Sequence, residues 1–340
     1  MVKYFLWIIV LLIFSTSCSN LKKIKVSQIE DMWFEYSPNQ DINHGSEFEG
    51  EILLQTYDGK QHEMSKNSKL TFLSSDIIRK DRSNTYTIIK KSSSFNDDNC
   101  VITLKYNYKE EEFVKKDSVT LNFQGSLRVL YDGDNGINGK DQRNKGTPLL
   151  FRDGHSGGDG PDGTDGESVG DYTAHLWKDS SFIYVYLKDE NTSNSYRYQM
   201  TIGNSIHFDF SGGNGGHGGD GGDGGNGKNG QLKGDKVKPP GDAGSGGHGG
   251  NGGNGGNGGN LKLIIHTNCA EVEQNITYSV KEGMAGRQGK PGKSGKPGTP
   301  LEGQQNAKNG WDGTSGESGY KGYNGNYTQY IEEFNSADYE

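Results

Sequence analysis

Glycine recurs at every third position through most of the second half of this 340-residue chain. The two longest runs extend from Gly212 to Gly230 and from Gly241 to Gly259. Three further runs and a short lead-in keep the same spacing: Gly154–Gly166, Gly283–Gly298, Gly310–Gly325, and Gly133, Gly136 and Gly139. Three residues per turn is the period of the polyproline II helix, which has no internal hydrogen bonds. A glycine in every turn therefore leaves one side open to another backbone, which must also supply the missing hydrogen-bond partners.

Three arrangements are compatible with such runs. Collagen needs far more proline than the eight residues in this chain, and only the stretch 289–298 has a collagen-like composition. A bundle within one chain needs runs of similar length and reversals such as 231–240. In a bundle, the Gly-Gly-Xaa runs 212–226 and 246–260 have two bare sides and should lie between neighbours, with the other runs outside. A flexible linker is the third arrangement, but it has no reason to keep a triplet phase.

Between residues 28 and 131 glycine is scarce, and apolar residues alternate with polar ones. The stretch Cys100–Tyr108 is the clearest example, and its period of two predicts a half-buried strand. Further strands are expected at 52–57, 70–72, 86–89, 119–123 and 127–131. We therefore predict a mainly β fold, with an N-terminal antiparallel β-sandwich at 28–131 and a glycine-rich polyproline II helix bundle at 132–328. Strand-like inserts at 172–210 and 260–280 should give that bundle an apolar core.

The first 17 residues have the composition of a secretory signal peptide. Lys3 precedes an apolar run from Tyr4 to Phe14, which is too short to span a bilayer, and small polar residues follow it. Cys18 comes directly after them. This order resembles the signal of bacterial lipoproteins in the loose form found in Bacteroidota, although Ser15 stands where leucine is usual. The resemblance implies that Cys18 is lipidated and begins a tether at 18–27, whereas the alternative is an ordinary signal peptide with an incidental cysteine.

The triplet pattern over about 133–326 resembles the glycine-rich polyproline II bundles of the snow flea antifreeze proteins and of certain phage tail-fibre adhesins. The antifreeze proteins are stapled by disulfides, and the phage adhesins carry no lipoprotein signal. The resemblance therefore concerns the architecture and implies no particular ligand.

Polar residues inside the glycine runs form two expected ladders, because every third residue of a polyproline II helix lies on one side, about 9 Å from the next. The members are His248, Asn251, Asn254, Asn257 and Asn260 in one ladder, and Asn214, His217, Asp220, Asp223 and Asn226 in the other. Such ladders could bind sugars or a surface, or could only keep the bundle soluble. Aromatic residues gather near the C-terminus: Trp311, Tyr320, Tyr323, Tyr327 and Tyr330. They could contact carbohydrate or protein, or cap the end of the bundle.

Other chemistry has little support in the sequence. The net charge is −8, from 36 Lys and Arg against 44 Asp and Glu, which argues against a nucleic-acid partner. No catalytic motif and no cofactor are expected, although Asp220 and Asp223 could bind Ca²⁺ weakly. Cys100 and Cys269 could form a disulfide in an exported protein, but sequence does not give the distance between them.

The sequence as a whole predicts a non-enzymatic, lipid-anchored envelope protein at the outer membrane or cell surface, with the periplasmic face left open. Its expected role is adhesion, ligand binding or structural display, with the membrane and a surface glycan or protein as partners. A collagen-like trimeric stalk is one alternative, and an ice- or calcium-binding surface protein is another. Residues 329–340 are expected to be a C-terminal tail.

Overall fold

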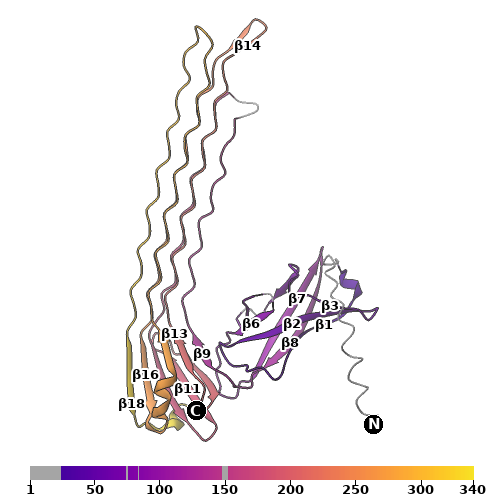
Figure 1. The fold of residues 1–340 in the computed structure, drawn as a ribbon, viewed down its shortest axis with the longest axis vertical. Coiled ribbons are helices and arrows are strands. Elements are labelled where there is room, and N and C mark those ends of the chain that lie inside the picture. Colours follow the sequence, from indigo (N-terminus) through magenta and orange to yellow (C-terminus); the bar gives the residue numbers. More distant parts are fainter. Residues whose placement is uncertain (1–23, 74–75, 83, 148–151) are drawn as a thin grey trace, which may run out of the picture. The chain divides into compact units, whose positions relative to one another are not determined.

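The computed structural model describes residues 24–73, 76–82, 84–147 and 152–340, which form two compact units (Figure 1). The described part of the first unit comprises residues 24–40, 47–73, 76–82, 84–90 and 99–120. The second unit comprises the described residues of 41–46, 91–98 and 121–340. The regular elements of both units are mainly β-strands, as the alternation of apolar and polar residues predicts.

The first unit contains two antiparallel sheets. One sheet has the order β1-β2-β6-β5 with β3 paired to β2, and the other has the order β4-β7-β8. A short 3₁₀-helix, η1 (Val26–Gln28), precedes the first strand. The strands are β1 (Ile29–Tyr36), β2 (Glu47–Thr56), β3 (Gln61–Glu63), β4 (Leu70–Phe72), β5 (Ile78–Lys80), β6 (Thr85–Ile88), β7 (Asn99–Tyr108) and β8 (Glu111–Thr120).

The core of the first unit follows from the alternation within its strands. In β7, Ile102, Leu104 and Tyr106 are fully buried, because successive side chains of a strand point to opposite faces. Phe34 of β1 packs edge-on against Phe72 of β4 and Tyr86 of β6, with ring centroids 6.4 and 4.8 Å apart. The two sheets therefore share one apolar layer, as expected for a sandwich.

The second unit contains a three-stranded and a five-stranded sheet. In the three-stranded sheet, with the order β17-β13-β9, both strand pairs are parallel. In the five-stranded sheet, with the order β12-β11-β10-β16-β18, the pairs β10-β16 and β16-β18 are parallel and the other two are antiparallel. The strands are β9 (Leu127–Leu130), β10 (Tyr172–Lys178), β11 (Phe182–Asp189), β12 (Ser195–Thr201), β13 (Ile206–Asp209), β16 (Leu261–His266), β17 (Ile276–Ser279) and β18 (Tyr327–Glu332). A separate hairpin joins β14 (Gln231–Lys233) to β15 (Lys236–Lys238), and the 3₁₀-helices are η2 (Thr267–Asn275) and η3 (Ser336–Asp338).

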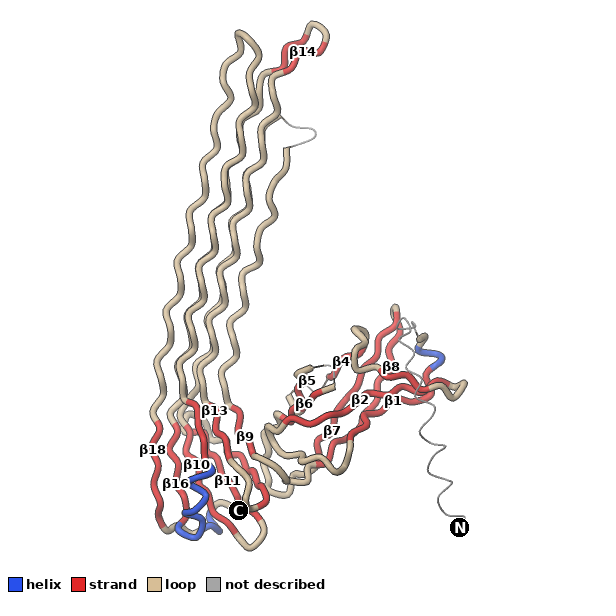
Figure 2. The backbone as a smooth tube through the Cα atoms, viewed as in Figure 1, coloured by secondary structure: helices blue, strands red, loops and turns tan. Residues whose placement is uncertain are grey.

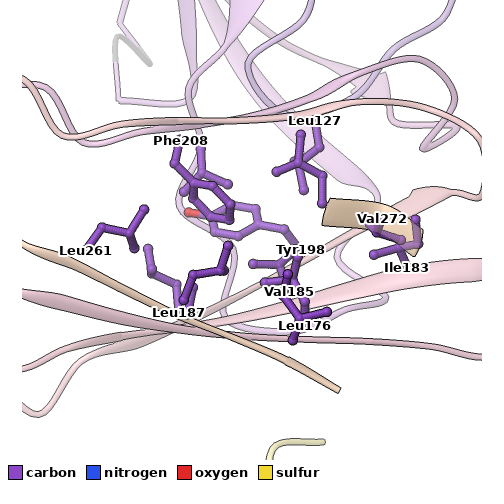
Figure 3. Packing of buried hydrophobic residues seen from close by; sticks show 14 of the residues in the cluster. Leu127, Leu176, Ile183, Val185, Leu187, Tyr198, Phe208, Leu261 and Val272 are labelled. Carbon is purple, nitrogen blue, oxygen red and sulfur yellow. The ribbon is translucent and has the colours of Figure 1, made fainter. Parts of the chain in front are cut away.

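Side chains from the two sheets of the second unit meet in one core. Figure 3 shows Leu127 and Phe208 of the three-stranded sheet facing Leu176, Val185 and Leu187 of the five-stranded sheet. All five side chains are fully buried. Val272 of η2 also belongs to this core. The inserts at 172–210 and 260–280 supply most of it, which confirms that they contribute the apolar core of this half of the chain.

Six extended glycine-rich segments continue from these strands and lie side by side (Figure 2). We number them segment I (132–147), segment II (152–171), segment III (211–230), segment IV (241–260), segment V (280–300) and segment VI (305–326). Segments I, III and V follow β9, β13 and β17, whereas segments II, IV and VI lead into β10, β16 and β18. The hairpin β14-β15 reverses the chain between segments III and IV, which confirms the reversal predicted at 231–240.

Backbone hydrogen bonds organise the segments into two layers, I-III-V and II-IV-VI, in the same order as the strands they join. Within the first layer, Gly136 N–H donates to Asn214 O, and Gly215 N–H donates to Met284 O. A second set of bonds crosses between the layers and links all six segments from VI to I. Its donors and acceptors include Gly319 to Gly286, Gly286 to Gly253, Gly253 to Gly216, Gly216 to Thr164, and Thr164 to Ile137, at 2.8 to 3.1 Å. Segments III and IV therefore lie between two neighbours in their own layer, as their two bare sides predict, whereas each of the other four segments has one.

The boundaries differ from the sequence predictions in several places. β9, which was expected to close the N-terminal sandwich, pairs with β13 in the second unit, and residues 41–46 and 91–98 belong there too. Alternation identifies a strand but not its partner, so it could not assign β9 to a sheet. The expected tail 329–340 overlaps β18, an edge strand with mostly exposed side chains and hence a weak periodic signal.

Candidate functional site

The ten residues of the two predicted ladders have a shared structural task. In segment III, Asn214, Asp220, Asp223 and Asn226 accept the backbone N–H of a segment V residue at side-chain Oδ1, and His217 accepts one at Nδ1, all at 2.7 to 2.9 Å. In segment IV, Asn251, Asn254, Asn257 and Asn260 accept N–H groups of segment VI through Oδ1, and His248 through Nδ1, at 2.7 to 3.0 Å. Each ladder thus joins two backbones of one layer.

These contacts explain why the third residue of each triplet is so often Asn, Asp or His. The glycine N–H groups donate to neighbouring carbonyls, whereas the N–H of the residue after each glycine of segment V, such as Met284, donates to a side-chain acceptor of segment III. One acceptor atom of each ladder residue is therefore already used. That the other polar atoms of these side chains bind a ligand stays a prediction.

Third residues of the triplets point away from the packed interior. A Cβ built on Gly215 would lie 2.1 Å from Gly253 O, and one on Gly216 would lie 2.1 Å from Ile137 O. Two of the three sides of segment III thus face other segments, and His217, on the third side, is exposed. Each layer consequently presents its third residues as parallel rows on one solvent-facing surface.

The outermost row of the layer II-IV-VI carries three exposed aromatic side chains. Trp311, Tyr320 and Tyr323 have exposed fractions of 81, 80 and 79 %. They share one triplet phase with Thr314 and Glu317, and Asn254 and Asn257 accept the N–H groups of the two tyrosines. In contrast, Tyr327 of β18 is half-buried and stacks on Tyr278, with ring centroids 3.6 Å apart, and Tyr330 lies under the Lys262 ammonium group. The predicted aromatic cluster thus divides into an exposed row on segment VI and a packed part on β18.

A half-open cavity of about 670 Å³ lies on the outer face of the five-stranded sheet of the second unit, beside Phe95, Trp177 and Tyr184. Two of its charged groups are engaged in structural contacts. Asp179 accepts the N–H groups of Ser181 and Phe182 and the Tyr184 hydroxyl, and these bonds hold the pKa of its carboxyl below the usual range. Lys178, which also lines the cavity, pairs with Glu271.

The outer face of the five-stranded sheet is covered by C-terminal aromatic residues. His175 of β10 stacks on Tyr339 with ring centroids 4.2 Å apart and meets Phe334 edge-on. Burial lowers the pKa of His175 to about 4, so the ring is neutral at neutral pH. Arg197 donates to the Tyr339 carbonyl and fixes this covering segment. The arrangement is that of a packed aromatic layer and not of an acid–base pair.

The structure bears on the disulfide and on the calcium ligands that the sequence suggested. Cys100 and Cys269 do not form a disulfide: each is buried in the core of a different unit, and the Cys269 thiol donates to the Leu176 carbonyl. Burial raises the pKa of Cys269 to about 11.

Across residues 24–340, apart from the undescribed positions, no three His, Cys, Asp or Glu side chains gather as metal ligands. Asp220 and Asp223 accept backbone N–H groups of segment V. Cys18 lies outside the described residues.

The structure also reveals features that the sequence analysis missed. Carboxylate and hydroxyl oxygens of segment II, including those of Asp159, Asp162 and Ser168, accept backbone N–H groups of segment IV. The triplet phase of Asp159, Asp162 and Asp165 was the available signal, but it did not identify the receiving backbone. Among the described residues, no helix combines the length and apolar character needed to span a bilayer.

Comparisons with protein-family models, with curated proteins and with solved structures give no significant match.

Proposed function

We propose that this chain is a lipid-anchored, non-enzymatic protein of the cell envelope that binds surface glycans along a rigid glycine-rich scaffold. The observation that carries the proposal is the row of exposed aromatic residues on segment VI. Aromatic faces pack against the C–H faces of sugar rings, and Asn and Asp side chains bond sugar hydroxyls. Both kinds of side chain lie in neighbouring rows of one surface.

We further propose that the six segments are polyproline II helices packed as a bundle within one chain. Support comes from the hydrogen bonds between segments, which recur every third residue, and from the tight backbone contacts at the glycines. Tyr320 and Tyr323 then lie about 9 Å apart along the segment. This spacing is close to one disaccharide unit of an extended glycan, so neighbouring rings can stack on alternate sugars.

The aromatic row gives the direct test. A chain with Trp311→Ala, Tyr320→Ala and Tyr323→Ala should bind neutral β-linked oligosaccharides roughly tenfold to a hundredfold more weakly, because each ring contact contributes about 1 kcal/mol. Cello- and chito-oligosaccharides are suitable probes, with affinity measured by isothermal titration calorimetry. Folding should be unchanged, because all three rings are exposed.

Tyr57→Ala in the first unit is the matched control, since Tyr57 is also a 72 % exposed aromatic residue. It should leave the affinity unchanged. Equal binding by the triple variant and the wild-type chain, or no binding of any neutral glycan by the wild-type chain, would contradict the aromatic row as a glycan site.

The proposed anchor is tested at Cys18. Acylation of this cysteine would hold the mature chain on the outer membrane or cell surface, or on the periplasmic face, without a transmembrane helix. Cys18→Ala should abolish incorporation of labelled fatty acid in a bacterial host and leave an unprocessed precursor on gels. Asn20→Ala is the control and should be acylated normally. Normal labelling of the Cys18 variant would show that the leader is not a lipoprotein signal.

A further inference from the structure

Segment V carries a straight row of cations on the surface of the layer I-III-V. Four occupy consecutive triplets, and a fifth lies two triplets before them: Arg287, Lys290, Lys293, Lys296 and Lys281. All five are exposed. In total, segment V holds five cations and one carboxylate, Glu282, whereas segment II in the other layer holds one cation and six carboxylates. Segment V therefore carries four more cations than carboxylates in a chain whose net charge is −8.

The backbone beneath these side chains is held at both its N–H and its C=O groups. Lys290 N–H donates to Asp220 Oδ1, and its carbonyl accepts from Gly221 N–H. Lys293 repeats the pattern with Asp223 and Gly224. If the rise is that of polyproline II, the four consecutive cations lie about 9 Å apart and span about 28 Å. A row on a fixed backbone loses less conformational entropy on binding than one on a flexible loop.

The five cations of the row form no ion pair with any residue that the structure describes. Other cations do find partners: Lys321 pairs with Glu282, and Lys188 with Glu190. Asp220 and Asp223 lie beside the row, but each uses Oδ1 for a backbone N–H, and neither is within ion-pair distance of a lysine ammonium group. Glu282 and Asp312 interact electrostatically with Lys281 and Lys293 beyond ion-pair distance, so they offset part of the charge. The remaining charge of the row is left for a partner.

We propose that this row binds a linear acidic polysaccharide with about one anionic group per disaccharide. The inference goes beyond the proposed function, because it adds a second glycan surface on the layer I-III-V, separate from the aromatic row of segment VI. An extended polysaccharide of this type repeats its charge at nearly the spacing of the row. A nucleic-acid strand carries a phosphate every ~3.4 Å along a duplex, so most of its charges would face no cation. Its dense charge would also be repelled by the acidic remainder of the chain.

The test uses the full chain and hyaluronan oligosaccharides, which have one carboxylate per disaccharide. Substituting Lys290→Gln, Lys293→Gln and Lys296→Gln together should weaken hyaluronan binding on the order of tenfold and reduce its dependence on salt. The matched control replaces the three exposed hairpin lysines, Lys233, Lys236 and Lys238, by glutamine and removes the same charge. The control should bind within about twofold of wild type, because simple attraction to net charge is screened beyond roughly 10 Å.

Four results would overturn the inference. The first is that the wild-type chain binds no hyaluronan, and the second is that the hairpin control loses as much affinity as the row variant. The third is that an oligothymidylate binds equally tightly through the same lysines, and the fourth is that light scattering shows an effect of the row on self-association alone.

The aromatic triple variant separates the two proposals. If neutral glycans depend on Trp311, Tyr320 and Tyr323 while hyaluronan is indifferent to the lysines, only the acidic-glycan inference fails. If hyaluronan depends on the lysines while neutral glycans do not bind, only the aromatic site fails.

Discussion

Replacing Gly250 by alanine should destabilise the second unit by more than about 3 kcal/mol or prevent its folding. A Cβ at this position would lie 2.1 Å from Pro161 O and 2.5 Å from Pro161 C, both backbone atoms of segment II. Gly250 N–H also donates to Gly219 O of segment III at 2.9 Å. Relief of the overlap would require segments II and IV to separate, and that movement would break hydrogen bonds along both. Urea unfolding followed by circular dichroism measures the loss.

Gly146 and Gly158 are graded controls for this substitution. A Cβ on Gly146 meets no atom within 4 Å, so Gly146→Ala should be neutral or stabilising by up to about 1 kcal/mol through the unfolded state. A Cβ on Gly158 meets only the flexible Gln142 side chain, at 3.0 Å, and should have a small effect. Equal stability of the Gly250 and Gly146 variants would favour the flexible-linker alternative.

The solution mass of the wild-type chain separates the two packed arrangements. The interlayer hydrogen bonds join segments of one chain, so light scattering should give the mass of a monomer. A trimer that dissociates in the Gly250 variant would instead support the collagen-like stalk.

The glycine pattern predicted the role of these segments more completely than the alternation predicted the sheets. Because glycine is the only residue without a Cβ, its positions in a run mark which sides face other backbones, and the two Gly-Gly runs are indeed central. Strand alternation contains no such information about partners. β9 therefore could not be placed beside β13, and β10, β16 and β18 could not be recognised as one parallel set.

The ladder residues show a different limit of sequence reasoning. Their exposed positions suggested either a binding surface or simple solubility, but Asn254 accepts the N–H of Tyr320, and Asp220 that of Lys290. In segments V and VI the N–H of the residue after a glycine donates to a side chain of the neighbouring segment, and this pairing becomes visible only when the neighbouring backbone is known. The neighbouring backbone also shows that two kinds of row differ in role. The aromatic and cationic rows lie on the outer segments VI and V, whereas the amide rows of the inner segments hold the layers together.

The second large effect is expected at the junction of sandwich and segments. Phe208 of β13 is fully buried, and Phe208→Ala should remove about 3 to 5 kcal/mol of unfolding free energy. Segment III begins two residues after β13 ends, and Gly259 N–H of segment IV donates to Phe210 O. Loss of core packing should therefore destabilise the adjoining glycine segments as well. Hydrogen exchange read by mass spectrometry should show peptides of β13 and of segments III and IV losing protection together.

Leu232→Ala on the β14-β15 hairpin is the control for Phe208→Ala, because Leu232 is 67 % exposed. This variant should leave hydrogen-exchange protection unchanged.

A hydrogen-bonded segment made mostly of glycine buries almost no side-chain surface, while ordering each of its residues costs about 1 to 2 kcal/mol of conformational entropy. The sandwich core must offset part of that cost, which is why each segment adjoins a strand. If segments III and IV kept full protection while β13 lost it, their own hydrogen bonds would suffice, and the two parts of the second unit would be independent.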